Sequence, residues 1–410
     1  MQPLSRRVLS LQQRPASMVG VCRSCRRRLA TTASSAAPPK PPASGLAELS
    51  SRRVLAVAGA DATKFLQGIV TQNVATVGGH GRNQQTTTPA SPRTEGFYAG
   101  FLNATGRVMH DTFIYPFRSG AGGLAALESG DGFLVEADAA QATRLEKYIK
   151  RYKLRAKVSV RSLAPDEVSV WQAWDDAAAA ADGAALSLPS STATMTLRDP
   201  RAPAMGYRVL QLGGGAPGVD AERADEDAYT IRRYLQGVPE GQDELLREHA
   251  LPLESNMEHM RGIDFHKGCY VGQELTIRTK HRGVVRKRVL PCVLYDVDRP
   301  APATLAYDPE GLASLSAAAV PGETGIGRFE KRGRSAGKWL KGVGNVGLAL
   351  CRLEIMTDVV LPGEQAAATY NPEDEFVLEW GGQEDVKSSV KIKAFVPDWL
   401  RAGMEEGLKK

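Results

Sequence analysis

Lys267-Gly268-Cys269-Tyr270-Val271-Gly272-Gln273-Glu274 is the stretch with the most unusual chemistry in the chain. It places one thiol between two glycines, with a lysine two positions before it. Glycine permits tight turns and close approach of a ligand. A nearby cation favours the thiolate, which is the form that attacks electrophiles and binds iron or zinc. From the residues alone, Cys269 is either a small buried apolar side chain or a reactive thiol and metal ligand.

The octapeptide is similar to the signature of the folate-binding, glycine-cleavage-T-protein-like family. Gln236 to Gly241 and Leu251 to Asn256 before it, and Gly283 to Arg288 after it, extend the resemblance. Further matches lie upstream, at Gly59 to Gly68, Thr71 to Asn73, Gly106 to Val108 and Asp111. Within that family, these segments closely resemble the mitochondrial iron–sulfur cluster assembly factors. The resemblance covers most of residues 46–300 and, more loosely, residues 325–353.

This resemblance implies an α+β fold, an aminomethyltransferase-like ring of three subdomains around a folate-sized hole, with a C-terminal β-barrel. It also implies a non-enzymatic role in the mitochondrial matrix, where the protein would act with A-type scaffold proteins to mature 4Fe–4S client proteins. Cys269 would be the key thiol and metal ligand of an iron–sulfur cluster transiently shared with a partner, and Lys267 would keep it anionic. The cofactor-binding residues would be Lys267, Gly268, Tyr270, Gly272, Gln273 and Glu274.

The alternative function is a tetrahydrofolate-dependent aminomethyl or one-carbon transferase with Asp111 as its catalytic base. Two departures from the transferases weigh against it. His110-Asp111 stands where those enzymes carry paired aspartates, and Leu235 stands where they carry a pterin-binding glutamate. A leucine cannot accept hydrogen bonds from the pterin ring, and a pocket that leaves polar groups unpaired loses affinity. The sequence therefore weakens the prediction of transfer chemistry and of folate binding.

Apolar periodicity predicts an α+β body at residues 43–280 and a smaller β-rich domain at 281–410. Strands are predicted at 53–58, 97–101 and 108–117. One helix follows Asp61, a second follows a capping box made by Asp138 and Gln141, and a third covers 224–235 and ends before Gly237. Strand-like runs then dominate, at 284–294, 343–350 and 390–396.

Four stretches rich in small, polar or charged residues predict surface insertions, at 76–95, 175–191, 303–322 and 330–341. Gly342 to Gly347 matches a dinucleotide-binding glycine pattern, which requires a helix after it. A strand-like run follows instead, so we interpret these glycines as the start of a strand. Residues 278–288 hold six bases and no acid. This run predicts a solvated strand edge and loop, or a face for an anionic ligand or an acidic partner.

The first 42 residues carry eight Arg and Lys and no acid, in a chain whose net charge is +6. This arginine- and serine-rich composition predicts a mitochondrial import sequence, cleaved between residues 30 and 42. What remains has 44 bases against 46 acids, which disfavours nucleic acid as a partner. No uncharged apolar stretch reaches the ~18 residues of a membrane span, so no membrane contact is predicted. Three scattered cysteines (Cys269, Cys292 and Cys351) suit a reducing compartment.

Overall fold

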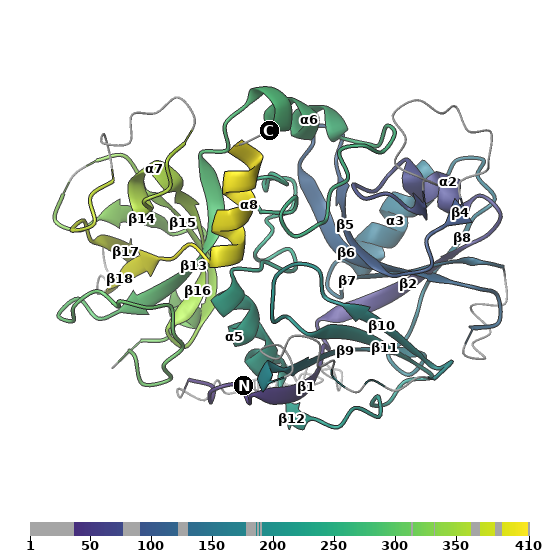
Figure 1. Ribbon diagram of the computed structural model, residues 1–410, viewed down its shortest axis with the longest axis horizontal. Coiled ribbons are helices and arrows are strands. Elements are labelled where there is room, and N and C mark those ends of the chain that lie inside the picture. Colours follow the sequence, from purple (N-terminus) through teal and green to yellow (C-terminus); the bar gives the residue numbers. More distant parts are fainter. Residues whose placement is uncertain are drawn as a thin grey trace, which may run out of the picture. The chain divides into compact units, whose positions relative to one another are not determined.

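The structure is a computed structural model that describes residues 37–76, 91–121, 130–177, 186, 188, 191–312, 315–331, 333–361, 370–381 and 388–408. It contains two five-stranded sheets, a closed barrel and the helices that pack on them (Figure 1). The predicted import sequence up to residue 36, and most of the predicted insertions at 76–95 and 175–191, lie outside the described residues.

The first sheet is antiparallel, with strand order β5-β6-β7-β2-β8. Its strands are β2 (Arg52–Ala58), β5 (Phe97–Leu102), β6 (Val108–Phe117), β7 (Gly132–Asp138) and β8 (Ser159–Ser162). The predictions of β2, β5 and β6 are confirmed, whereas β7 and β8 were not predicted. The helices α2 (Ala62–Gln67) and α3 (Ala142–Tyr152) contribute to an apolar cluster on one face of this sheet.

The two predicted N-terminal caps on these helices are wrong in their chemistry. Asp61 precedes α2 as predicted, but its side chain makes no cap bond and instead accepts a hydrogen bond from the Lys157 N–H at 2.7 Å. The capping residue of α3 is Gln141, again without a side-chain cap bond. Asp138 accepts instead from the N–H groups of Ala140 and Gln242, at 2.8 and 3.1 Å. Both carboxylates therefore accept hydrogen bonds from backbone N–H groups that lie outside the helices they were predicted to cap.

The second sheet has the order β10-β11-β9-β1-β12 and places the first strand of the chain inside the sheet. Its strands are β1 (Ser44–Glu48), β9 (Val168–Asp175), β10 (Thr194–Arg198), β11 (Tyr207–Leu212) and β12 (Glu222–Ala224). β1 is antiparallel to β9 and parallel to β12. One continuous apolar cluster contains residues from both sheets, among them Val54, Phe113, Val170 and Leu210.

The helix α5 (Glu226–Gln236) confirms the predicted end before Gly237, but it begins two residues later than predicted, because Ala224 belongs to β12. Asp225 caps it by accepting a hydrogen bond from the Ala228 N–H at 2.8 Å. Gly237 ends it with φ +71°, a left-handed conformation that favours glycine. The segment that follows, from Val238 to Glu244, leads directly into the polar interior of the body.

The barrel closes in the order β13-β16-β15-β14-β17-β18. Its strands are β13 (Lys287–Tyr295), β14 (Gly325–Arg328), β15 (Gly337–Val343), β16 (Val346–Arg352), β17 (Phe376–Trp380) and β18 (Ser388–Ala394). The predicted strand at 343–350 is partly wrong, since Gly344-Asn345 is the turn of the β15–β16 hairpin. The predicted insertion at 330–341 is wrong from Gly337 onward, because β15 places Trp339 fully inside the barrel.

Helix α6 (Gln273–Arg282) replaces much of the strand edge and loop predicted at 278–288. The predicted boundary between residues 280 and 281 lies inside this helix. Two further helices complete the barrel side, α7 (Leu353–Met356) and α8 (Asp398–Leu408). α8 packs Leu400 and Met404 on the barrel core, and the Trp399 indole N–H donates to Gln236 O at 3.0 Å. Among the described residues, no helix combines the length and apolar character of a membrane span.

Candidate functional site

The octapeptide loop is clamped to the segment after α2 by Lys267. The Lys267 ammonium donates to the carbonyl oxygens of Val70 and Gln72, at 2.6 and 2.9 Å, and stacks 5.0 Å from the centre of the Tyr270 ring. Burial lowers the pKa of this ammonium to about 7, against an opposing effect of Asp264. The contacts of Lys267 therefore go to two backbone carbonyls and a ring, and the predicted pairing of Lys267 with Cys269 is not among the contacts of the described residues.

Two glycines from distant segments meet at the start of α6. Gly272 has φ +80°, and a Cβ added to it would lie 2.2 Å from Asn103 O and 3.2 Å from Gly106 Cα. Gly106 has φ +82°, and a Cβ there would lie 2.8 Å from Gly272 O. The turn between β5 and β6 therefore fits against the octapeptide only because both positions lack a side chain. The two motifs of the resemblance form one structural unit.

The remaining octapeptide residues divide into those that hold the loop and those that face solvent. Gln273 links back to Tyr270, since its Oε1 accepts from the Tyr270 N–H and its own N–H donates to Tyr270 O, both at 3.3 Å. Burial raises the pKa of the Tyr270 phenol to about 12. Gly268 and Glu274 are exposed, and a Cβ at Gly268 would have no atom within 4 Å.

Cys269 is the exposed cysteine of the three that the structure describes. It occupies the solvent-facing part of a loop whose flanks are fixed by Lys267 and Gln273. Cys292 and Cys351 lie inside the barrel with no exposed surface and with their sulfur atoms 4.0 Å apart. Among the described residues, no three His, Cys, Asp or Glu side chains gather in a way that could hold a metal ion.

Asp111, the predicted catalytic base, is fully buried on β6. Its Oδ1 accepts from the Gly241 N–H at 3.1 Å and from the Gln242 amide at 3.4 Å, and its Oδ2 lies 3.5 Å from the Arg52 guanidinium. Both oxygens therefore have partners. In this arrangement the side chain ties β6 to the segment that follows α5.

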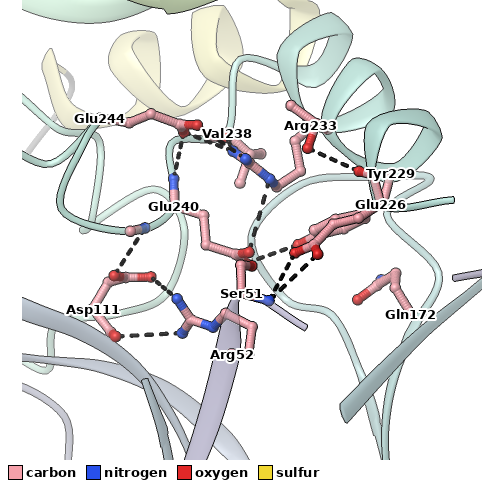
Figure 2. A network of polar contacts seen from close by, with 12 residues as sticks. Ser51, Arg52, Asp111, Gln172, Glu226, Tyr229, Arg233, Val238, Glu240 and Glu244 are labelled. Carbon is pink, nitrogen blue, oxygen red and sulfur yellow. Dashed lines mark hydrogen bonds and ion pairs between the residues drawn. The ribbon is translucent and has the colours of Figure 1, made fainter. Parts of the chain in front are cut away.

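Around Asp111 lies a network of buried arginines and carboxylates, which the sequence did not predict (Figure 2). Glu240 is its centre, because its Oε2 accepts from Arg201, Arg208 and the Tyr229 hydroxyl. Glu244 pairs with Arg233 at 2.7 Å. The other members are Arg52, Glu136 and Asp199. Burial alone would raise the pKa of Glu240, but the surrounding guanidinium groups hold it well below its usual range.

The residues present do not fit a bound folate at the positions that the transferases use. The Asp111 oxygens are already bonded, and Leu235 packs against an apolar cluster on the barrel side that includes Ile231 and Val289. Neither position presents a free carboxylate to a pterin ring. The signal that could have identified the network was the Pro239-Glu240-Gly241 sequence after α5, which places an acid directly after a helix end.

This combination of sheets and a closed barrel is an aminomethyltransferase-like fold. The chain resembles the crystal structure of the glycine cleavage system aminomethyltransferase T from Bartonella henselae, with a TM-score of 0.55 and 13% identity over 87% of this chain and 86% of that one. That likeness concerns the fold alone. Residues 286–402 match the family model of the CAF17 C-terminal beta-barrel domain.

Its relatives in sequence define a narrower family. The chain is 56% identical to the mitochondrial iron–sulfur cluster assembly factor IBA57 homolog of Pyricularia oryzae, over 88% of this chain and 86% of that protein. It is 50% identical to the homolog of the same name from Chaetomium globosum, over 90% and 86%. The chain therefore belongs to the IBA57 family.

Proposed function

We propose that the protein assists the maturation of mitochondrial 4Fe–4S proteins by presenting Cys269 as one ligand of a cluster that an A-type scaffold protein holds. The observation that supports this role is an exposed thiol on a loop anchored on both sides. Lys267 fixes the loop to Val70 and Gln72, and Gly272 fixes it to the β5–β6 turn. Relatives at 50–56% identity carry the name of iron–sulfur cluster assembly factors.

Ligand chemistry makes this a shared site. On binding, the Cys269 thiol would lose its proton to solvent and its sulfur would coordinate one iron of the incoming cluster. Iron–sulfur clusters are commonly held by four thiolates. Cys292 and Cys351 are enclosed in the barrel core and cannot reach the same cluster. No other thiol of the described residues can therefore contribute, so in this scheme the partner supplies the remaining ligands and the cluster is cargo.

The test is anaerobic mixing of the protein with a cluster-loaded A-type scaffold protein. In gel filtration of the mixture, wild type is expected to elute in a complex that carries the visible absorption of the cluster, and Cys269→Ala to leave that absorption with the scaffold protein alone. Cys292→Ala serves as the matched control, since it removes a thiol that the partner cannot reach. In cells that lack the native protein, full rescue of aconitase activity by Cys269→Ala would contradict the role of the thiol.

Tetrahydrofolate-dependent transfer is the rival function. It requires Asp111 to release its bonds to Gly241 and Gln242 before it can accept a proton. Calorimetry with tetrahydrofolate distinguishes the two functions. If the protein is a transferase, Asp111→Asn will bind the folate and lose turnover. Our proposal requires no folate, and turnover that depends on Asp111 would overturn its non-enzymatic character.

The mitochondrial matrix is the proposed location, and two contacts support a proposal for where the mature chain starts. The Tyr307 hydroxyl donates to Pro38 O, and the Trp174 indole N–H donates to Pro42 O at 2.9 Å. A mature protein that retains both contacts begins at or before Pro38. We therefore expect cleavage between residues 30 and 37, which N-terminal sequencing of the protein from mitochondria will measure.

A further inference from the structure

We propose that helix α6 and the pocket at its C-terminal end form the docking surface for the partner that shares Cys269. That partner would present an acidic face with one protruding apolar side chain. The inference rests on the proposed function, because it assigns a surface to the same exchange. It concerns protein–protein recognition, which is separable from coordination by the thiol.

The first observation is the charge of α6. Arg278, Lys280 and Arg282 are exposed on this helix, and none of them makes an ion pair with a described residue. Arg107, by contrast, is bonded to His249 O, and Arg161 is paired with Glu167. Lys280 lies over the Phe265 ring, but no described acidic side chain pairs with these three cations, so their charge can meet an anionic partner. Charges of this kind steer association and set the register of an interface.

The second observation is a pocket of about 110 Å³ where α6 ends. Thr279 and Lys280 of α6 line it together with Met404 and Gly407 of α8. Figure 1 shows the end of α8 beside α6. The remaining walls are largely apolar, from Leu253, Val284, Val285, Leu353, Val359, Val360 and Leu361. Val360 is 51% exposed, which is unusual for a large apolar residue in this chain.

Two of the basic side chains that line the pocket are paired with an acidic side chain of the pocket itself. Among the described residues, the basic side chain of the pocket without such a partner is Lys280, on α6. The Arg288 guanidinium lies 2.9 Å from Glu258, and His259 lies 3.3 Å from the same carboxylate. Burial lowers the pKa of His259 to about 4. The exposed acids Glu405 and Glu406 belong to α8. An occupant with acidic residues is therefore attracted to the α6 rim, while its apolar side chain fills the pocket.

The spacing of these features suits a single interface. A ten-residue helix is about 15 Å long, and α6 begins four residues after Cys269. A stable protein–protein contact buries about 800 Å² on each partner, which is wide enough to span a helix of that length. A protein whose cluster reaches Cys269 would therefore also cover α6 and reach the pocket.

The test is calorimetric titration of an apo A-type scaffold protein into wild type and variants, without any cluster. Arg278→Glu combined with Arg282→Glu reverses the charge of the exposed face of α6. Val360→Glu places a negative charge at the pocket. We expect each to weaken binding by about tenfold or more, and the double variant to lose much of the salt dependence of binding.

The matched controls carry the same chemical changes elsewhere. Arg144→Glu with Lys147→Glu reverses two exposed cations on α3, and Leu154→Glu alters a leucine that is 85% exposed. These should bind within about twofold of wild type, as surface changes outside an interface do. Circular dichroism of every variant checks that the fold is retained.

Cys269→Ala separates this inference from the proposed function. Apo binding by Cys269→Ala at wild-type strength, with loss of the shared cluster, supports both. If the α6 and pocket variants bind as well as the α3 controls, the docking surface is overturned while the thiol's role stands. The docking surface is also overturned if Cys269→Ala abolishes binding while the α6 and pocket variants still bind. Absence of binding by wild type would overturn the assignment of this partner.

Discussion

Replacing Gly272 by alanine is the sharpest perturbation of the loop that carries Cys269. The residue sits in the left-handed region at φ +80°, where a Cβ costs about 1–2 kcal/mol. The new Cβ would also lie 2.2 Å from Asn103 O and 2.9 Å from Leu102 Cβ. Leu102 ends β5 and Asn103 begins the tight turn to β6, so relief of these contacts requires backbone movement. Overpacking of this kind costs about 1–3 kcal/mol.

Together these two effects predict that Gly272→Ala lowers the free energy of unfolding by about 2–5 kcal/mol. Gly268→Ala is the matched control within the same octapeptide. Its Cβ would meet no atom within 4 Å, and its φ lies outside the left-handed region. We expect it to change stability by no more than about 0.5 kcal/mol.

Urea denaturation measures both variants, and hydrogen exchange of residues 267–282 shows where the change is localised. Gly272→Ala should speed exchange across the octapeptide and the first turn of α6, and it should impair cluster sharing more than Gly268→Ala does. Equal stability changes in the two variants would refute the steric argument, because only one of the two sites is crowded.

Three further predictions concern the buried groups. Glu240→Gln removes the negative charge that several guanidinium groups share and should cost about 3–5 kcal/mol in urea denaturation, whereas Glu274→Gln on the surface should cost almost nothing. Similar losses in the two variants would contradict the network's role. Cys292→Ala opens a gap in the barrel core and should cost about 1–2 kcal/mol, while Cys269→Ala should be neutral in thermal melts. Burial, followed by the charge of Arg247, lowers the pKa of His110 to about 3. Between pH 6.5 and 3 the unfolded chain therefore binds a proton that the native chain does not, so stability falls on acidification by up to about 1.4 kcal/mol per pH unit. His110→Phe should flatten that slope, and unchanged slopes in melts at pH 5 and 7 would count against this assignment.

The sequence predicts the parts of the fold whose signal is local. β2 and β6 follow from their apolar pattern, and the end of α5 follows from the glycine at 237, whereas its cap at Asp225 was not predicted. Helix α6 was not predicted, because Thr276 is its one buried residue and the helix therefore has no apolar stripe. The Asp138 capping box failed because the carboxylate bonds to Gln242, more than a hundred residues away.

The candidate site divides in the same way. The octapeptide predicts Cys269 as the functional thiol, which stays a prediction, and the structure adds that this thiol is exposed while its flanks are fixed. The close contact between Gly106 and Gly272 could not be predicted, because the two motifs become neighbours only in the folded chain. The buried network was missed for a similar reason. Glu136 lies on a strand that was not predicted, and charged residues within strands usually indicate a solvent-facing side.

The placement of β1 has a consequence for how the chain reaches its native state. β9, β10 and β11 can form a sheet from nearby segments, but β1 pairs along β9 from more than a hundred residues upstream. Until β1 arrives, β9 presents an open edge that carries Trp171 and Trp174. Non-local pairing of this kind forms slowly, and bare apolar edges invite aggregation. The nascent protein therefore passes through a stage at which a chaperone has a defined surface to protect, and β1 removes that surface when it joins the sheet.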